Sequence, residues 1–271
     1  MQLLLRELFA LFFRKKISDK KSSIPLYKTD YKIRPEGKNS PLITTLNEFN
    51  DYFKYDGKIY NSLFWLNKAK RRKKLMSFLM WDENAGFFFD YNFKKKNKTN
   101  YQSATTFYPL WAKFASKKQA ALLVNKALPL LEESGGMAAS SKGSRGPLSK
   151  NRPQKQWDYP YGWAPHQIMI WEGLKNYGYE KISARLAYKW LYTILKNFAD
   201  YNGTIPEKYN VVSRSHKVFA EYGNVGTEFE YITKEGFGWM NASFKVGLNF
   251  IDDKQKEKLN KMIPPEWIEW Y

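Results

Sequence analysis

The sequence lacks cysteine and has little histidine, and both shortages narrow the chemistry available to it. None of the 271 residues is a cysteine, which excludes disulfides and thiol nucleophiles and is compatible with a cytosolic redox setting. The two histidines, His166 and His216, lie far apart, and no residues around them have the spacing that metal ligands require. We therefore expect no metal centre.

Long apolar runs are also missing. No stretch of about 18 apolar residues occurs, so no transmembrane helix is predicted. Residues 1–13 are apolar, but Arg6 and Glu7 interrupt them and Lys15 and Lys16 follow, whereas a signal peptide carries its basic residues before the apolar segment. We interpret this segment as an amphipathic helix and expect a cytoplasmic protein with no membrane partner.

Acidic residues are scarce relative to basic ones. The chain has 45 Lys and Arg residues against 26 Asp and Glu residues, and this net charge of +19 by itself suggests an anionic partner such as nucleic acid. The lysines, however, form short clusters at 70–74, 94–98 and 254–261, without an RNA-binding motif or a long basic arm. We favour solvated surface lysines and expect no nucleic-acid partner.

No strand-like runs alternate with the helical segments, which excludes a parallel α/β fold. Apolar residues instead recur at helical spacing, most clearly at Ile182, Leu186 and Trp190. Helices are predicted at residues 2–14, 44–55, 58–80, 104–114, 117–131, 166–177, 181–199 and 239–250. An irregular connector at 15–42 and a surface loop at 138–155 separate some of them. Such helix pairs predict a bundle or toroid with its function in the long loops.

Residues 156–165 read Gln-Trp-Asp-Tyr-Pro-Tyr-Gly-Trp-Ala-Pro, the most unusual stretch of the chain. Proline removes backbone donors and glycine permits unusual dihedral angles, so we expect an ordered loop rather than a helix interior or a regular strand. Its flat aromatic faces and few polar groups suit a carbohydrate pocket. The alternative is an aromatic loop that only fills a core. Two further loops, at 206–210 and 223–239, hold carboxylates, which glycoside hydrolysis needs in pairs.

Several segments together resemble the trehalases of glycoside hydrolase family 37. Residues 156–165 match the second signature of that family, except that Tyr161 stands where asparagine is common. A Gly-Phe-Gly-Trp-Met-Asn segment at 236–241 and a Trp-Asp-x-x-x-Gly turn at 81–86 are similar to family segments in the same order. Shorter matches are Asp90-Tyr91, Tyr108-Pro109-Leu110 and Gly135-Gly136. The resemblance covers about residues 57–251.

The resemblance implies an all-α fold, an (α/α)6 toroid, of which residues 57–271 would be the C-terminal portion. Residues 1–56 do not resemble the family and are predicted to be a divergent N-terminal segment, a helix followed by an irregular connector. The implied reaction is inverting hydrolysis of the disaccharide α,α-trehalose to two glucoses, and no cofactor is implied. One carboxyl group protonates the leaving oxygen in such a reaction while a second activates water.

Site residues follow from the same resemblance. Glu207, in a Glu-Lys-Tyr segment, matches the catalytic base of the family; the alternative is a surface glutamate beside Lys208. Trp157 matches a pocket tryptophan and would stack on a glucose ring. Gln156 and Asp158 would bind sugar hydroxyls or brace the loop.

A sugar-binding glutamate precedes the family's Gly-Phe-Gly-Trp by a fixed interval, which selects Glu230, with Glu228 as the second choice. The catalytic acid of the family, in a Gly-Trp-Asp-Phe-Ser-type segment, has no match in this sequence. The chain is then a fragment of an enzyme or an acid-less protein, and we expect weak or no turnover from it alone. A non-catalytic sugar-binding remnant or another (α/α)6 exo-α-glucosidase are the alternative interpretations.

Overall fold

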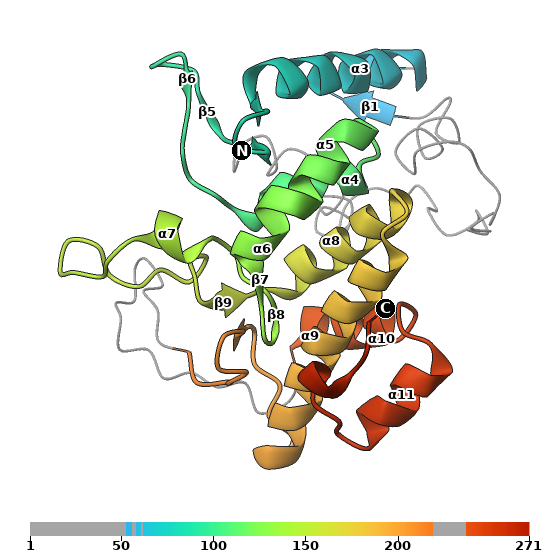
Figure 1. The fold of residues 1–271 in the computed structure, drawn as a ribbon. Helices are drawn as coiled ribbons and strands as arrows, with labels where there is room; N and C mark the ends of the chain where they lie inside the picture. The colour runs from blue at the N-terminus through green and yellow to red at the C-terminus, as the bar shows by residue number, and fades with distance from the viewer. Residues whose placement is uncertain (1–52, 56–57, 61, 219–236, 271) are drawn as a thin grey trace.

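A computed structural model describes residues 53–55, 58–60, 62–218 and 237–270, and helices make up most of its regular structure (Figure 1). The longer helices are α3 (Ser62–Leu79), α8 (Ala164–Asn176), α9 (Glu180–Asp200), α10 (Gly238–Gly247) and α11 (Asp253–Asn260). The shorter ones are η1 (Ala104–Phe107), α4 (Tyr108–Trp111), α5 (Lys117–Leu122), α6 (Leu128–Leu131), α7 (Lys142–Arg145) and η3 (Pro265–Trp267). The predicted helix 2–14 and the connector 15–42 lie outside the described residues.

Each sheet in the described part of the chain has two short antiparallel strands. Four of the pairs are local hairpins, β1 (Phe53–Tyr55) with β2 (Lys58–Tyr60), β3 (Trp81–Asp82) with β4 (Phe87–Phe88), β5 (Tyr91–Asn92) with β6 (Asn97–Lys98), and β7 (Glu132–Glu133) with β8 (Gly136–Met137). The fifth pair, β9 (Tyr161–Gly162) with β10 (Tyr209–Asn210), instead joins segments far apart in the sequence. That pair positions the candidate site.

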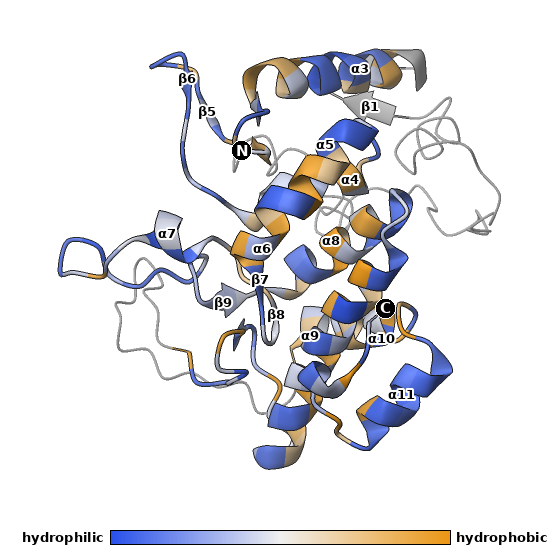
Figure 2. Ribbon diagram, in the orientation of Figure 1, coloured by the Kyte–Doolittle hydropathy of each residue, from blue (hydrophilic) through white to orange (hydrophobic). Residues whose placement is uncertain are grey.

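The helices α8 and α9 form the centre of the described core. Gly178, whose φ of +84° suits glycine, lies in the short turn between them, so α9 folds back and packs along α8. Helix α10 packs against both, and Trp171, Trp190 and Leu191 are fully buried among them. By contrast, α11 is strongly hydrophilic (Figure 2). The helix predicted at 181–199 is confirmed, one residue longer at each end.

The helix predicted at 117–131 is also present, but it is not uniform. It begins with a capping box between Ser116 and Gln119 and then widens into a π-helical turn at Leu123–Ala127 before α6. Pro129 lies in the first turn of α6 and has no N–H group to bond the carbonyl four residues earlier. The proline therefore accounts for the local departure from α-helical bonding.

Two predicted helix boundaries near residues 53–62 are wrong. Residues 53–55 belong to β1, not to the end of a helix over 44–55, and the helix expected from residue 58 starts at Ser62 instead. The β1 and β2 segments read Phe-Lys-Tyr and Lys-Ile-Tyr, and their aromatic and β-branched residues favour a paired strand.

The prediction of a surface loop at 138–155 is only partly correct. Ala138 and Ala139 are fully buried at the start of this segment. The N–H group of Ala139 donates to the Tyr161 carbonyl oxygen at 2.8 Å, which anchors the segment beneath the aromatic stretch. Local composition predicted exposure, but the non-local hydrogen bond determines burial here.

Candidate active site

The aromatic stretch and the Glu-Lys-Tyr segment are brought together by backbone pairing. In the β9–β10 register, Gly162 lies opposite Tyr209 and Tyr161 lies opposite Asn210. Continuing that antiparallel register by one residue sets Trp163 opposite Lys208. Residues 161–162 are therefore a short strand rather than loop, which the sequence alone did not predict.

Trp157 and Glu207 are linked through two side chains that lie between them. The Trp157 and Trp163 rings stack with centroids 3.7 Å apart and an interplanar angle of 6°. The Lys208 ammonium nitrogen lies 4.7 Å from the Trp163 ring centroid. The same nitrogen donates to Glu207 Oε2 at 2.9 Å. The predicted sugar platform and the predicted base thus belong to one contiguous cluster, which we call the Trp157–Glu207 cluster.

Exposure differs sharply across this cluster. Trp163 and Lys208 are buried, with 1% of the residue and 2% of the side chain exposed, respectively. Trp157 is 39% exposed and the Glu207 side chain is 27% exposed. Burial lowers the pKa of Lys208, and the hydrogen bond to Glu207 opposes that shift. Trp157 and Glu207 are therefore accessible to a solute, and the buried Trp163 and Lys208 lie between them and hold them in place.

Two more aromatic side chains complete the surroundings. The Trp239 indole N–H donates to the Glu207 backbone oxygen at 3.0 Å, and its ring meets Trp163 edge-on at 5.7 Å. His166 packs edge-on against Trp157 at 5.3 Å. Burial lowers the pKa of His166 to about 4, so the ring is neutral at pH 7.

Asp158 faces into the protein. Its Oδ2 accepts from Arg152 at 2.8 Å, and its Oδ1 accepts from the Tyr101 hydroxyl. Burial, together with that hydrogen bond, raises the pKa of Tyr101 to about 12. The loop is held further by Ser140, which accepts from the Tyr159 N–H at 2.9 Å. These contacts make residues 152–160 a braced loop.

The remaining predicted residues fall in two groups. Gln156 lies in the same loop, and its backbone oxygen accepts from the Trp163 indole at 2.8 Å. Glu230 and Glu228 lie outside the described residues. Sequence reasoning gave no role to Trp163 and named Lys208 only as the neighbour of Glu207. The signals for both were present, since Trp163 belongs to the aromatic stretch and Lys208 is the central residue of Glu-Lys-Tyr.

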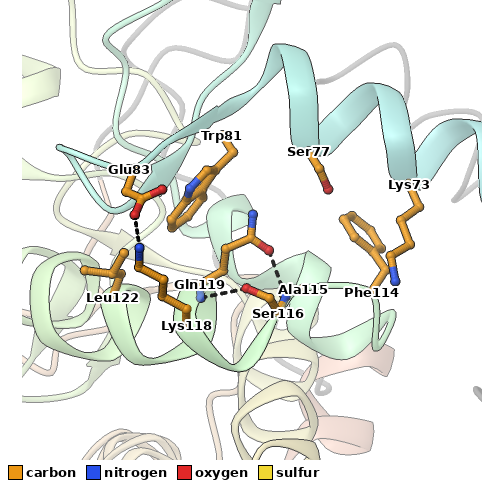
Figure 3. Close-up of a pocket in the computed structure, with 10 residues that line it drawn as sticks. All are labelled: Lys73, Ser77, Trp81, Glu83, Phe114, Ala115, Ser116, Lys118, Gln119 and Leu122. Atoms are coloured by element: carbon orange, nitrogen blue, oxygen red, sulfur yellow. Dashed lines mark hydrogen bonds and ion pairs between the residues drawn. The ribbon is translucent and has the colours of Figure 1, made fainter.

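The structure also has a cavity of about 380 Å³ in a different place (Figure 3). Lys73 and Ser77 of α3 line one side, and Phe114 and Gln119 line the other. The Gln119 side chain is occupied by the capping box of α5. None of the predicted site residues that the structure describes lines this cavity. Within the described part of the chain, no group of three or more His, Cys, Asp or Glu side chains could hold a metal ion.

Comparison with solved structures identifies the class of protein. The neutral trehalase of Saccharomyces cerevisiae superimposes with a TM-score of 0.68 at 46% identity, over 83% of this chain and 38% of that one. An uncharacterised conserved protein from Thermus thermophilus shares the fold, with a TM-score of 0.51 at 20% identity over 69% of this chain and 41% of its own. The protein is thus a helical-toroid protein, and the predicted all-α (α/α)6 class is confirmed.

Comparison of sequences identifies the family. The trehalase family model matches residues 37–252. This chain belongs to the trehalase family, as the motifs predicted.

Curated relatives agree with the family assignment and show how much of a full-length trehalase this chain covers. The cytosolic neutral trehalase of Saccharomyces cerevisiae is 51% identical over 212 residues, and that of Neurospora crassa is 48% identical over 211 residues. These matches cover 78% and 77% of this chain, but 28% of each relative. The chain thus spans little more than a quarter of their length. None of the described helices has the length and apolarity that a membrane span requires.

Proposed function

We propose that this chain provides the water-activating side of a site that hydrolyses α,α-trehalose. Glu207 is the general base and Trp157 is the surface on which a glucose ring stacks. The observation that carries the proposal is the continuous contact path from Trp157 through Trp163 and Lys208 to Glu207. Membership of the trehalase family supports it.

The chemistry assigned to Glu207 is inversion at the anomeric carbon. Its carboxylate takes a proton from a water molecule that attacks the carbon from the face opposite the leaving oxygen. The partly exposed side chain allows that water to approach. The acid must lie about 6.5–9.5 Å away to leave room for the water.

Sugar binding is assigned to the exposed edge of the cluster. Trp157 offers an indole face, and Gln156 beside it and Glu230 supply hydrogen bonds to hydroxyls. Asp158 is assigned a bracing role, because Arg152 and Tyr101 engage its two carboxylate oxygens. A cytoplasmic location is inferred as well, since the relatives are named cytosolic trehalases.

Titration calorimetry of the full chain with trehalose, and with maltose as a second α-glucoside, tests this proposal. We expect trehalose to bind and Trp157→Ala to abolish the binding, while Glu207→Gln retains it. Any glucose released from trehalose should disappear in Glu207→Gln. If trehalose binds but no glucose release depends on Glu207, the chain is better described as a sugar-binding remnant. Glucose release from maltose in preference to trehalose would favour another exo-α-glucosidase. Absence of trehalose binding would contradict the proposal.

A further inference from the structure

Lys208 is the least exposed charged side chain of the candidate site. Its side chain is 2% exposed, and its ammonium group contacts the Glu207 carboxylate and the Trp163 ring. Taking a charge out of water costs several kcal/mol, so a buried ion pair is a weak means of stabilising a fold. A buried pair of this kind can instead define one specific geometry.

The geometry that Lys208 defines includes both functional ends of the cluster. Glu207 Oε2 accepts from the ammonium group, which fixes the direction in which the carboxylate is presented. The ammonium group also lies over the Trp163 ring, and Trp163 stacks on Trp157. One cation is thus in contact with the base and with the ring that supports the sugar platform.

We propose that Lys208 is a positioning residue that couples the orientation of the Glu207 carboxylate to the Trp157 platform through Trp163. This inference rests on the proposed function for the roles of Glu207 and Trp157. The coupling itself is a property of the folded chain. It predicts that a change at the Glu207 side chain is transmitted to Trp163 only while Lys208 is present.

Fluorine NMR of the full chain labelled with 5-fluorotryptophan can measure that transmission. The chain has ten tryptophans, and single Trp→Phe variants assign the resonances of Trp157, Trp163 and Trp239. Trp111 serves as the reference, because its indole N–H donates to Glu172 outside the cluster. The variants are Glu207→Gln, Lys208→Met and the double variant, which replaces the ion pair by a neutral pair of similar size.

We expect Glu207→Gln to shift the Trp163 resonance, and we expect that shift to vanish in the Lys208→Met background. Trp239 should move little, because it bonds the backbone oxygen of Glu207, and Trp111 should not move. Lys208→Met should also shift Trp157 and weaken trehalose binding by up to about 30-fold, the size expected for one desolvated cation–π contact.

Two results would overturn the inference. The first is a Trp163 shift on Glu207→Gln that persists in the Lys208→Met background. The second is an unchanged Trp163 resonance in Glu207→Gln alone. This result would overturn the inference even if Lys208→Met does not fold. Failure of the proposed function looks different, because the wild-type chain would not bind trehalose while the transmitted shift would still be present.

Discussion

At the scale of single residues, Trp157 and Trp163 share one stacked contact but have opposite surroundings. Trp157 is 39% exposed, whereas Trp163 is 1% exposed and also contacts Lys208 and Trp239. Removing a buried indole leaves a cavity that costs about 3–5 kcal/mol of unfolding free energy. Removing an exposed one costs much less, since water already solvates much of the ring.

This contrast gives a matched pair of variants. We expect Trp157→Ala to lose trehalose binding while its unfolding free energy falls by less than about 1.5 kcal/mol. Trp163→Ala should lower the unfolding free energy by about 3–5 kcal/mol. Chemical denaturation and calorimetry of both variants measure these effects. Equal destabilisation of the two would mean that Trp157 is a packing residue and not a platform.

His166 predicts how stability depends on pH. Its pKa falls from 6.5 to about 4 on folding because burial disfavours the charged ring. Between those values the unfolded chain binds a proton that the folded chain does not, so stability decreases as the pH falls from 6.5 toward 4. The contribution lost over this range is roughly 3 kcal/mol.

His166→Phe should remove that part of the pH dependence. A phenyl ring keeps a flat shape at a position where the imidazole Nδ1 has no hydrogen-bond partner among the described residues. Urea unfolding of the wild type and the variant at several pH values between 4 and 7 provides the measurement. A variant with the same slope of unfolding free energy against pH as the wild type would refute this assignment.

At the scale of elements, the β9–β10 pair brings the Glu-Lys-Tyr segment to the aromatic stretch. The pair can form because Gly162 has no side chain. A Cβ atom there would lie 2.4 Å from Val211 Cγ1 and 2.8 Å from the Met137 carbonyl oxygen, both far below contact distance. The close approach of β8, β9 and the residue after β10 thus depends on this single glycine.

We therefore expect Gly162→Ala to lower the unfolding free energy by about 1–3 kcal/mol, the usual cost of overpacking, and to weaken trehalose binding. Gly238→Ala is the matched control, because a Cβ at the start of α10 meets no atom of the described residues within 4 Å. That substitution should be neutral or slightly stabilising. Thermal unfolding of the two variants tests the contrast, and an unperturbed Gly162→Ala would argue against tight β9–β10 packing.

At the scale of the whole molecule, coverage of the relatives determines what activity to expect. The chain covers 28% of the two cytosolic neutral trehalases, and the Gly-Trp-Asp-Phe-Ser-type segment that the resemblance predicts to hold the acid has no match in its sequence. The proposed base, Glu207, would then act without a partner acid that protonates the leaving-group oxygen, and general acid catalysis contributes typically 10²–10⁴-fold. The helical scaffold around Glu207 is nevertheless present and well packed.

We predict weak or no release of glucose from trehalose by these 271 residues alone. A coupled glucose assay over extended incubation gives the rate, with Glu207→Gln as the blank. Substantial turnover that Glu207→Gln abolishes would contradict this prediction and would mean that another carboxyl group serves as the acid.

Sequence by itself determined the helical class, a helix over residues 181–199 and the family, because apolar periodicity and short motifs are local properties of the chain. It also selected Trp157 and Glu207, through the resemblance. Strands β1 and β9 were not predicted, since two- and three-residue strands form through partners that local composition does not reveal.

Only the tertiary structure decided how the candidate site is assembled. The β9–β10 register sets Lys208 against Trp163, and the burial of Lys208 makes it part of the site rather than a solvated neighbour of Glu207. The Asp158 side chain is likewise buried because of its tertiary contacts, since Arg152 and Tyr101 bond its carboxylate. The sequence specifies which chemical groups are present. Which side chains are buried and which strands pair depends on distances between segments that are set only when the chain folds.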